Sequence, residues 1–417
     1  MSRKSTILLM FALLAVPAFA ATRMTYDIQG NSIPIQWEPT AFPLRYEIDA
    51  SLSSRADLIH RAFQAWQDVT AANVSFQRGN IVQNGGSMND GKVVVSMADS
   101  LFANQGAFAL TTYTFDTTGR FTDVDIQVDP LLFKGNFNAE MALQHEVGHL
   151  LGLDHSAVLS SVMFPHVTRG NDELTFDSDD RLAIAAAYPK SDPTLLGATL
   201  QGRVMGDRGA IFAGQVVALN DRGSPVATAL TDETGAFTIA GVPAGKYRLY
   251  VEPLDGPVKT SDLRGVWRHA STVSFPTQFY GETLQVENGK LYGNLIVSAS
   301  GGAARLNPEL IGSAAPGSNG FSLSREVVVV KPGQTFDLAV AGDGFTSGMT
   351  ELDILNPAFR RVSDYRYASD YVSATYTVDA NAAGGSAVIL VKSGNESATL
   401  TGALRINSPK RSRAVGR

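Results

Sequence analysis

Three of the six histidines in the chain lie within eleven residues of one another. Residues 145 to 155 read His-Glu-Val-Gly-His-Leu-Leu-Gly-Leu-Asp-His. On a helix, His145 and His149 would share one face, so both imidazoles could reach one metal ion. Gly152 can adopt a positive φ, which would end the helix and bring His155 back toward that ion. Three nitrogen ligands leave the fourth position of a tetrahedral zinc site open, which is typical of a catalytic site.

Glu146 directly follows the first of these histidines. At this position a carboxylate can hydrogen-bond a water on the metal without becoming a ligand itself. A zinc site kept only for structure or binding needs no such residue. The pattern therefore predicts hydrolysis by an activated water with Glu146 as general base. Histidines satisfied inside a core, and a zinc site without turnover, are the alternatives.

Helices and a small sheet are expected to position this motif. Asn138 can cap a helix over 139–151, with Glu140 in its first turn facing the helix dipole. Apolar residues recur at helical spacing over 55–69, where His60 falls on the polar side and is interpreted as a solvated histidine. Stretches that predict strands lie at 45–50, 92–96, 106–115 and 121–128.

Acidic residues near the motif could also bind metal. Asp179 and Asp180 open a helix expected over 179–187, and first-turn carboxylates suit the helix dipole better than a metal. Aspartates between Asp116 and Asp129 could hold Ca²⁺, but aspartates in turns usually only cap the turn. Zinc therefore remains the main metal expectation and calcium a weaker one.

The extended zinc motif of the metzincins is matched by His145, Glu146, His149, Gly152 and His155. Met163, in Ser-Val-Met-Phe-Pro, falls where the methionine turn of that family lies. Leu153 to Ser156, the eight-residue step from His155 to Met163, and the helix that ends near Tyr188 resemble the matrixin branch in particular. The resemblance covers residues 33–189. It implies an α+β matrixin-like fold with a twisted sheet, an active-site helix beneath it, and one catalytic zinc at the floor of a substrate cleft.

The same resemblance implies roles for residues around the zinc. Met163 would form a packing floor under the metal and would not be a ligand. One wall of the primary specificity pocket would consist of Pro165, His166 and Val167. Residues 106–110 resemble the edge strand that pairs with extended substrate in such peptidases, although an ordinary buried strand fits the sequence equally well.

The chain also departs from the animal matrixin pattern. His60, His166 and His269 are too scattered to build the structural-zinc loop of those enzymes. No cysteine exists to block the zinc in a latent form, and residues 21–32 are too few for a folded propeptide. We therefore expect one zinc and no thiol switch.

Helical periodicity disappears in the second half of the chain, which favours all-β domains. Residues 232–237 and 241–249 resemble the carboxypeptidase regulatory-like β-sandwich, and 331–336 with 342–345 resemble immunoglobulin-like modules. The chain is thus expected to be multi-domain, with a matrixin-like domain followed by two β-sandwiches. The expected divisions are a signal peptide at 1–20, the zinc peptidase domain at 21–190, the first sandwich at 195–297, a linker at 298–320, the second sandwich at 321–408 and a disordered tail at 409–417.

Charge and the first residues bear on location and partners. A formal net charge of −6 and no Lys/Arg stripe along any expected helix exclude nucleic acid as a partner. Arg3 and Lys4 precede an apolar run at 7–16, and small residues stand at Ala18 and Ala20, as in an export signal. That run is too short to span a membrane, and no later stretch is long enough. We expect a secreted protein, or one of the periplasm or cell envelope.

These observations lead to an exported zinc endopeptidase that acts on protein or peptide substrates. The rival is a surface adhesion or binding protein whose β domains hold a partner while the zinc domain lacks turnover. Glu146 favours the peptidase. The β domains occupy about half of the chain and could contact a cell surface, which supports the rival.

Overall fold

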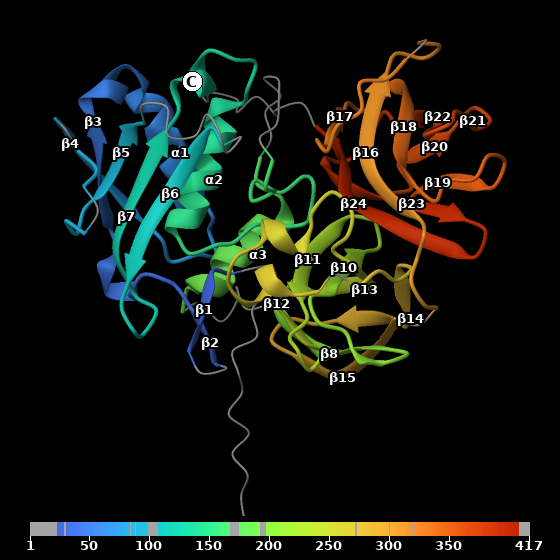
Figure 1. Ribbon diagram of the computed structural model, residues 1–417, viewed down its shortest axis with the longest axis horizontal. Helices are drawn as coiled ribbons and strands as arrows, with labels where there is room; N and C mark the ends of the chain where they lie inside the picture. The colour runs from blue at the N-terminus through green and yellow to red at the C-terminus, as the bar shows by residue number, and fades with distance from the viewer. Residues whose placement is uncertain are drawn as a thin grey trace, which may run out of the picture.

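The computed structural model describes residues 23–28, 31–83, 85–87, 89–98, 107–166, 175–191, 197–271, 273–299, 301–318 and 320–407. The segments expected as signal peptide and tail lie outside these residues, as do Gly106 and Val167. Among the described helices, none is long and apolar enough to cross a membrane. Figure 1 shows three bodies, which we call the first (residues 23–191), the second (197–299) and the third (301–407).

The first body combines one five-stranded sheet with helices, as expected from the sequence. The strand order is β4-β3-β5-β7-β6, and only the edge strand β6 runs antiparallel to its neighbour. The strands are β3 (Leu44–Asp49), β4 (Phe76–Val82), β5 (Val93–Met97), β6 (Ala109–Phe115) and β7 (Phe121–Val128), and a separate hairpin joins β1 (Thr25–Ile28) to β2 (Asn31–Pro34). The helices are α1 (Ala56–Gln67), α2 (Ala139–Leu150) and α3 (Ser178–Ala187), with short 3-10 turns at Pro39–Ala41, Ala50–Arg55 and Pro130–Phe133.

Local sequence explains why the helices form where they do. The apolar stripe of α1 buries Ile59, Phe63 and Trp66 in the core, and the indole of Trp66 donates to the carbonyl of Gln144 in α2 at 2.8 Å. The side chain of Asn138 accepts from the backbone N–H of Met141 and so caps α2. The cap and the packing of α1 fix the direction in which α2 presents its side chains.

The second body is a sandwich of two sheets. Their orders are β11-β10-β13-β14 and β12-β8-β15, with β9 attached to β8. The strands are β8 (Ala198–Gly206), β9 (Gly209–Ala210), β10 (Gln215–Asn220), β11 (Pro225–Leu230), β12 (Ala236–Val242), β13 (Gly245–Glu252), β14 (Gln278–Val286) and β15 (Leu291–Ala299). Between β13 and β14 a long loop carries two 3-10 turns, η5 (Thr260–Asp262) and η6 (Gly265–His269).

The third body is also a two-sheet sandwich. Its sheets have the orders β16-β18-β22-β20, with β21 paired to β22, and β17-β24-β23-β19. The strands are β16 (Asn307–Ala314), β17 (Val328–Val330), β18 (Thr335–Asp343), β19 (Thr350–Ile354), β20 (Phe359–Arg361), β21 (Arg366–Tyr367), β22 (Tyr371–Val378), β23 (Gly385–Ser393) and β24 (Glu396–Ile406).

The linker expected at 298–320 is wrong for its middle part, because β16 lies there and pairs with β18. The small residues that suggested a linker have a packing role. Ile311 is 1% exposed in the core, and a Cβ at Gly312 would overlap the carbonyl of Ser322. Glycine is therefore needed at position 312, where the backbone of β16 comes close to that of Ser322. The small residues of this stretch are thus compatible with a strand.

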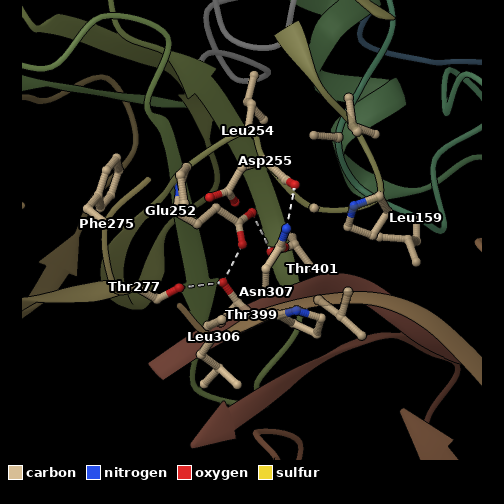
Figure 2. A pocket seen from close by; sticks show the side chains of 18 residues that line it. Leu159, Glu252, Leu254, Asp255, Phe275, Thr277, Leu306, Asn307, Thr399 and Thr401 are labelled. Carbon is tan, nitrogen blue, oxygen red and sulfur yellow. Dashed lines mark hydrogen bonds between the residues drawn. The ribbon is translucent and has the colours of Figure 1, made fainter. Parts of the chain in front are cut away.

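Buried polar groups join the second and third bodies. Glu252 in β13 accepts hydrogen bonds from the hydroxyls of Thr399 and Thr401 in β24, the latter at 2.7 Å, and from the Gln215 amide at 2.6 Å. Figure 2 shows this junction, which surrounds a cavity of about 30 Å³. The first body takes part as well, because Leu159 packs in the apolar core of the third.

The junction predicts a pH-dependent stability. Burial raises the pKa of Glu252 to about 7 from an ordinary 4.5, so the folded chain keeps a proton there that the unfolded chain loses. Stability from this group is present at low pH and is lost as the pH rises from about 4.5 through 7. Relative to a Glu252→Gln chain, which cannot titrate there, we expect the wild type to lose roughly 3 kcal/mol over this window in urea unfolding of the metal-free protein. Parallel pH profiles of the two chains would contradict this assignment.

Candidate active site

The structure brings His145, His149 and His155 together. The first two lie on one face of α2, and the chain turns at Gly152, whose φ is 85°. A Cβ at this glycine would overlap the carbonyl of Ile35, so glycine is needed for both conformation and space. One ring nitrogen from each histidine lies within 4.8 Å of the others. Among the described residues this is the one cluster of His, Asp or Glu with the geometry of a metal site.

The outward ring nitrogens of the histidines all face backbone carbonyls. Nδ1 of His145 lies 2.7 Å from the carbonyl oxygen of Val162, Nδ1 of His149 lies 2.8 Å from that of Leu153, and Nδ1 of His155 contacts that of Asp262. A carbonyl only accepts, so each Nδ1 must carry the proton and each Nε2 must present its lone pair. Each imidazole thus keeps one unprotonated nitrogen, as a zinc ion requires of its ligands.

Electrostatics keep these imidazoles neutral. Burial is the main cause that lowers the pKa of all three, to about 3 for His155 and well below the ordinary value for His149. The positive charge of Arg264 lowers each pKa further. Neutral imidazole is the form that binds a metal, so the donor set fits zinc near neutral pH.

Glu146 is buried beside the cluster, at 6% exposure. The hydroxyl of Thr111 in β6 lies 2.6 Å from its Oε2 and 3.0 Å from its backbone carbonyl oxygen. Thr111 therefore orients the carboxylate from the edge strand. Sequence reasoning missed this residue, although its inward position in an alternating strand opposite the motif helix was a signal that could have found it.

Met163 packs against α2 from below the motif. It is 2% exposed, and a Cβ at Gly148 would overlap its sulfur and approach Trp66 to 3.0 Å. The turn around Met163 is held by Asp180, whose carboxylate accepts from the backbone N–H groups of Val162 and Met163 at 3.0 and 3.3 Å. Asp180 thus does more than suit the helix dipole, because it fixes the segment that orients His145.

Asp179 and the other aspartates serve structure and lie apart from the histidine cluster. Asp179 accepts from the hydroxyl of Ser156 at 2.8 Å and from Thr228 of the second body, so it joins two bodies. The carboxylates between Asp116 and Asp129 accept hydrogen bonds from backbone N–H groups of nearby turns and strands.

His60 lies outside the site. Its Nδ1 forms a hydrogen bond with the Tyr46 hydroxyl at 2.9 Å, and it does not line the cleft over the three histidines.

Replacing Gly148 by alanine is expected to disturb the site from below. The added methyl group would push both Met163 and Trp66 away from α2. The cost of this displacement outweighs the better helix propensity of alanine. We expect a loss of about 1 to 3 kcal/mol in stability together with weaker zinc binding, measured by urea unfolding and competition with a chelating dye. Gly281→Ala is the matched control, because a Cβ there meets nothing within 4 Å. Unchanged zinc affinity in the Gly148 variant would rule out this packing role.

A cleft of about 520 Å³ opens over the histidines. Its lining includes the start of β6 with the residues before it, from Ala107 to Leu110, and also Phe164, Pro165 and His166. Two further residues, Arg264 and Glu326, come from the second and third bodies. No local sequence signal could reveal them, because they lie more than a hundred residues from the motif.

Comparisons with known proteins agree with the geometry. The matrixin family profile matches residues 36–189, and the carboxypeptidase regulatory-like domain profile matches residues 199–276. Interstitial collagenase B of Mus musculus is 29% identical over 218 residues, covering 49% of this chain and 42% of that protein. Metalloendoproteinase 2-MMP of Arabidopsis thaliana is 31% identical over 153 residues, covering 33% of this chain and 38% of that protein.

The chain therefore spans about two fifths of the length of these curated relatives. A solved structure of the ICAM-5 D1–D4 ectodomain fragment covers 50% of this chain at 14% identity, with a TM-score of 0.17 that is too low to define a shared fold. The family assignment rests on the sequence matches and on the sheet, helices and histidine cluster of the first body. Residues 36–189 are a matrixin domain, and residues 199–276 are a carboxypeptidase regulatory-like domain.

Proposed function

We propose that this protein is a secreted zinc-dependent endopeptidase that cuts extracellular or cell-envelope proteins. The observation that carries the proposal is the convergence of three neutral imidazoles, each with its lone pair facing inward, beside the buried carboxylate of Glu146 at a cleft of about 520 Å³. Curated relatives named as a collagenase and a metalloendoproteinase support it. The apolar run at 7–16 supports export.

The residues have distinct parts in the proposed reaction. His145, His149 and His155 would hold one zinc, which supplies Lewis acidity toward the scissile carbonyl and acidifies a water. Glu146, oriented by Thr111, takes a proton from the attacking water and passes it to the leaving amine nitrogen. The outer edge of β6, which is the last strand in its sheet, would bind the extended substrate through backbone hydrogen bonds, which gives affinity with little dependence on sequence.

Cleavage assays with a metal control test this proposal. The chain from Ala21 onward is incubated with unfolded casein and with a mixed peptide library, before and after removal of metal by a chelator and after addition of zinc. We expect cleavage at internal peptide bonds, its loss with the chelator and its return with one equivalent of zinc. A folded chain with one bound zinc and no cleavage would favour an adhesion protein that uses its β domains for cell-surface contact.

A further inference from the structure

A loop of the second body is built into the zinc site of the first. It runs from β13 to β14 and carries η5 and η6. The carbonyl of Asp262 accepts from Nδ1 of His155, and the backbone N–H of Arg264 donates to the carboxylate of Asp154 at 2.8 Å. A Cβ at Gly265, whose φ is 61°, would overlap the hydroxyl of Thr25. These contacts fix the loop, and with it the position from which the Arg264 side chain starts.

The guanidinium of Arg264 faces the cleft. Its central carbon lies 5.9 Å from the ring centroid of Tyr113 in β6, on the edge strand. Of the described residues that line the cleft, Arg264 is the one lysine or arginine. None of the ion pairs among the described residues includes Arg264, although its charge partly offsets the rise that burial causes in the pKa of Asp154. Glu146 and Glu326 line the same cleft. A half-buried guanidinium at the cleft can bind an anionic group that enters with the substrate.

The position of Tyr113 indicates which part of a substrate this cation would meet. Tyr113 lies two residues beyond Thr111, which touches Glu146, and this step is about 7 Å along a strand. Antiparallel pairing, the slightly more stable kind, would place the N-terminal part of a peptide beside Tyr113. The C-terminal part would then lie toward Ala107, at the other end of the cleft wall.

We propose that Arg264 makes the enzyme prefer peptides with an aspartate or glutamate side chain two or three residues before the cleaved bond. This inference rests on the proposed peptidase function and adds a substrate class to it. A planar guanidinium can bind a carboxylate through two parallel hydrogen bonds, and the half-buried position strengthens the pair. The selecting residue thus belongs to the carboxypeptidase regulatory-like domain, while the hydrolytic residues belong to the matrixin domain.

Matched peptides test the inference. Starting from a peptide that the chain cleaves, glutamate and glutamine are exchanged at each of four positions on either side of the cleaved bond. We expect the glutamate peptide to show about tenfold higher kcat/KM at the second or third position before the bond. In Arg264→Ala this ratio falls to about one, and in Arg264→Glu a lysine peptide becomes the preferred one.

Controls separate this effect from damage to the metal site. Arg268→Ala removes an exposed arginine of the same loop and should keep the tenfold ratio, and bound zinc is measured in every variant. An acidic preference that survives in Arg264→Ala would overturn the inference. So would a preference located after the cleaved bond, or one that disappears when the C-terminal carboxylate is amidated.

Peptide binding to the Glu146→Gln chain, followed by fluorescence anisotropy, measures the same preference without turnover. Tighter binding of the glutamate peptide, lost when Arg264→Ala is added, supports the inference even if the wild type cleaves nothing. Equal affinity for the glutamate and glutamine peptides overturns it. Cleavage of glutamine peptides by the wild type, together with equal affinities, would leave the proposed peptidase function intact.

Discussion

Replacing Glu146 by glutamine is expected to lower kcat/KM by about three orders of magnitude while one zinc stays bound. Glutamine keeps the shape of the side chain and can still accept the hydrogen bond from Thr111. It cannot take a proton from the attacking water, so the loss falls on the chemical step. The measurement is steady-state hydrolysis of a quenched fluorescent peptide, with zinc content determined on the same samples.

Glu140→Gln is the matched control for that change. Glu140 lies in the first turn of α2 and forms an exposed ion pair with Arg61 at 2.9 Å, so the substitution changes the same charge on the same helix. We expect nearly full activity, because exposed ion pairs contribute little to stability. A Glu146→Gln chain that retained more than a tenth of the wild-type activity would show that another group is the base.

Removing residues 192–417 is expected to weaken zinc binding by ten- to a hundredfold. The matrixin domain would lose the Asp262 carbonyl that orients His155. It would also expose Leu159 and Phe164, which are 3% exposed in the full chain and pack in the core of the third body. Zinc affinity by competition with a chelating dye and thermal unfolding measure the two effects.

Asp154→Asn in the full chain separates the ligand effect from a folding failure of the truncated chain. This change puts an amide where the carboxylate of Asp154 now accepts from the backbone N–H groups of His155 and Arg264, at 2.7 and 2.8 Å. The loop should then hold His155 less firmly, and zinc affinity should fall by about tenfold. If the truncated chain and the Asp154→Asn chain both bound zinc as tightly as the wild type, the matrixin domain would hold its metal without help from the second body.

The histidine cluster could be predicted because its signals are local. The four-residue spacing of His145 and His149, the Asn138 cap and the turn at Gly152 each require only helix geometry, and the structure has all three features. Fold class followed in the same way from periodicity in the first body and from alternating strands in the other two.

The parts of the site and of the fold that could not be predicted depend on contacts between residues far apart in the sequence. Arg264 reaches the cleft from a different domain, and Asp179 bonds Thr228 across a body boundary, so neither role has a local pattern. The linker expected at 298–320 was wrong for its middle part, where β16 lies, because composition does not show that Gly312 packs against a neighbouring backbone. Local periodicity indicates which face of an element is buried, but it does not indicate which partner covers that face.

Titration of the metal-free chain with zinc tests the central claim most directly. Bound zinc and the rate of peptide cleavage are measured together at each addition. We predict that cleavage is absent without metal, rises in proportion to bound zinc and levels off at one zinc per chain. Cleavage that is complete without metal, or absent with one zinc bound at the three histidines, would contradict it.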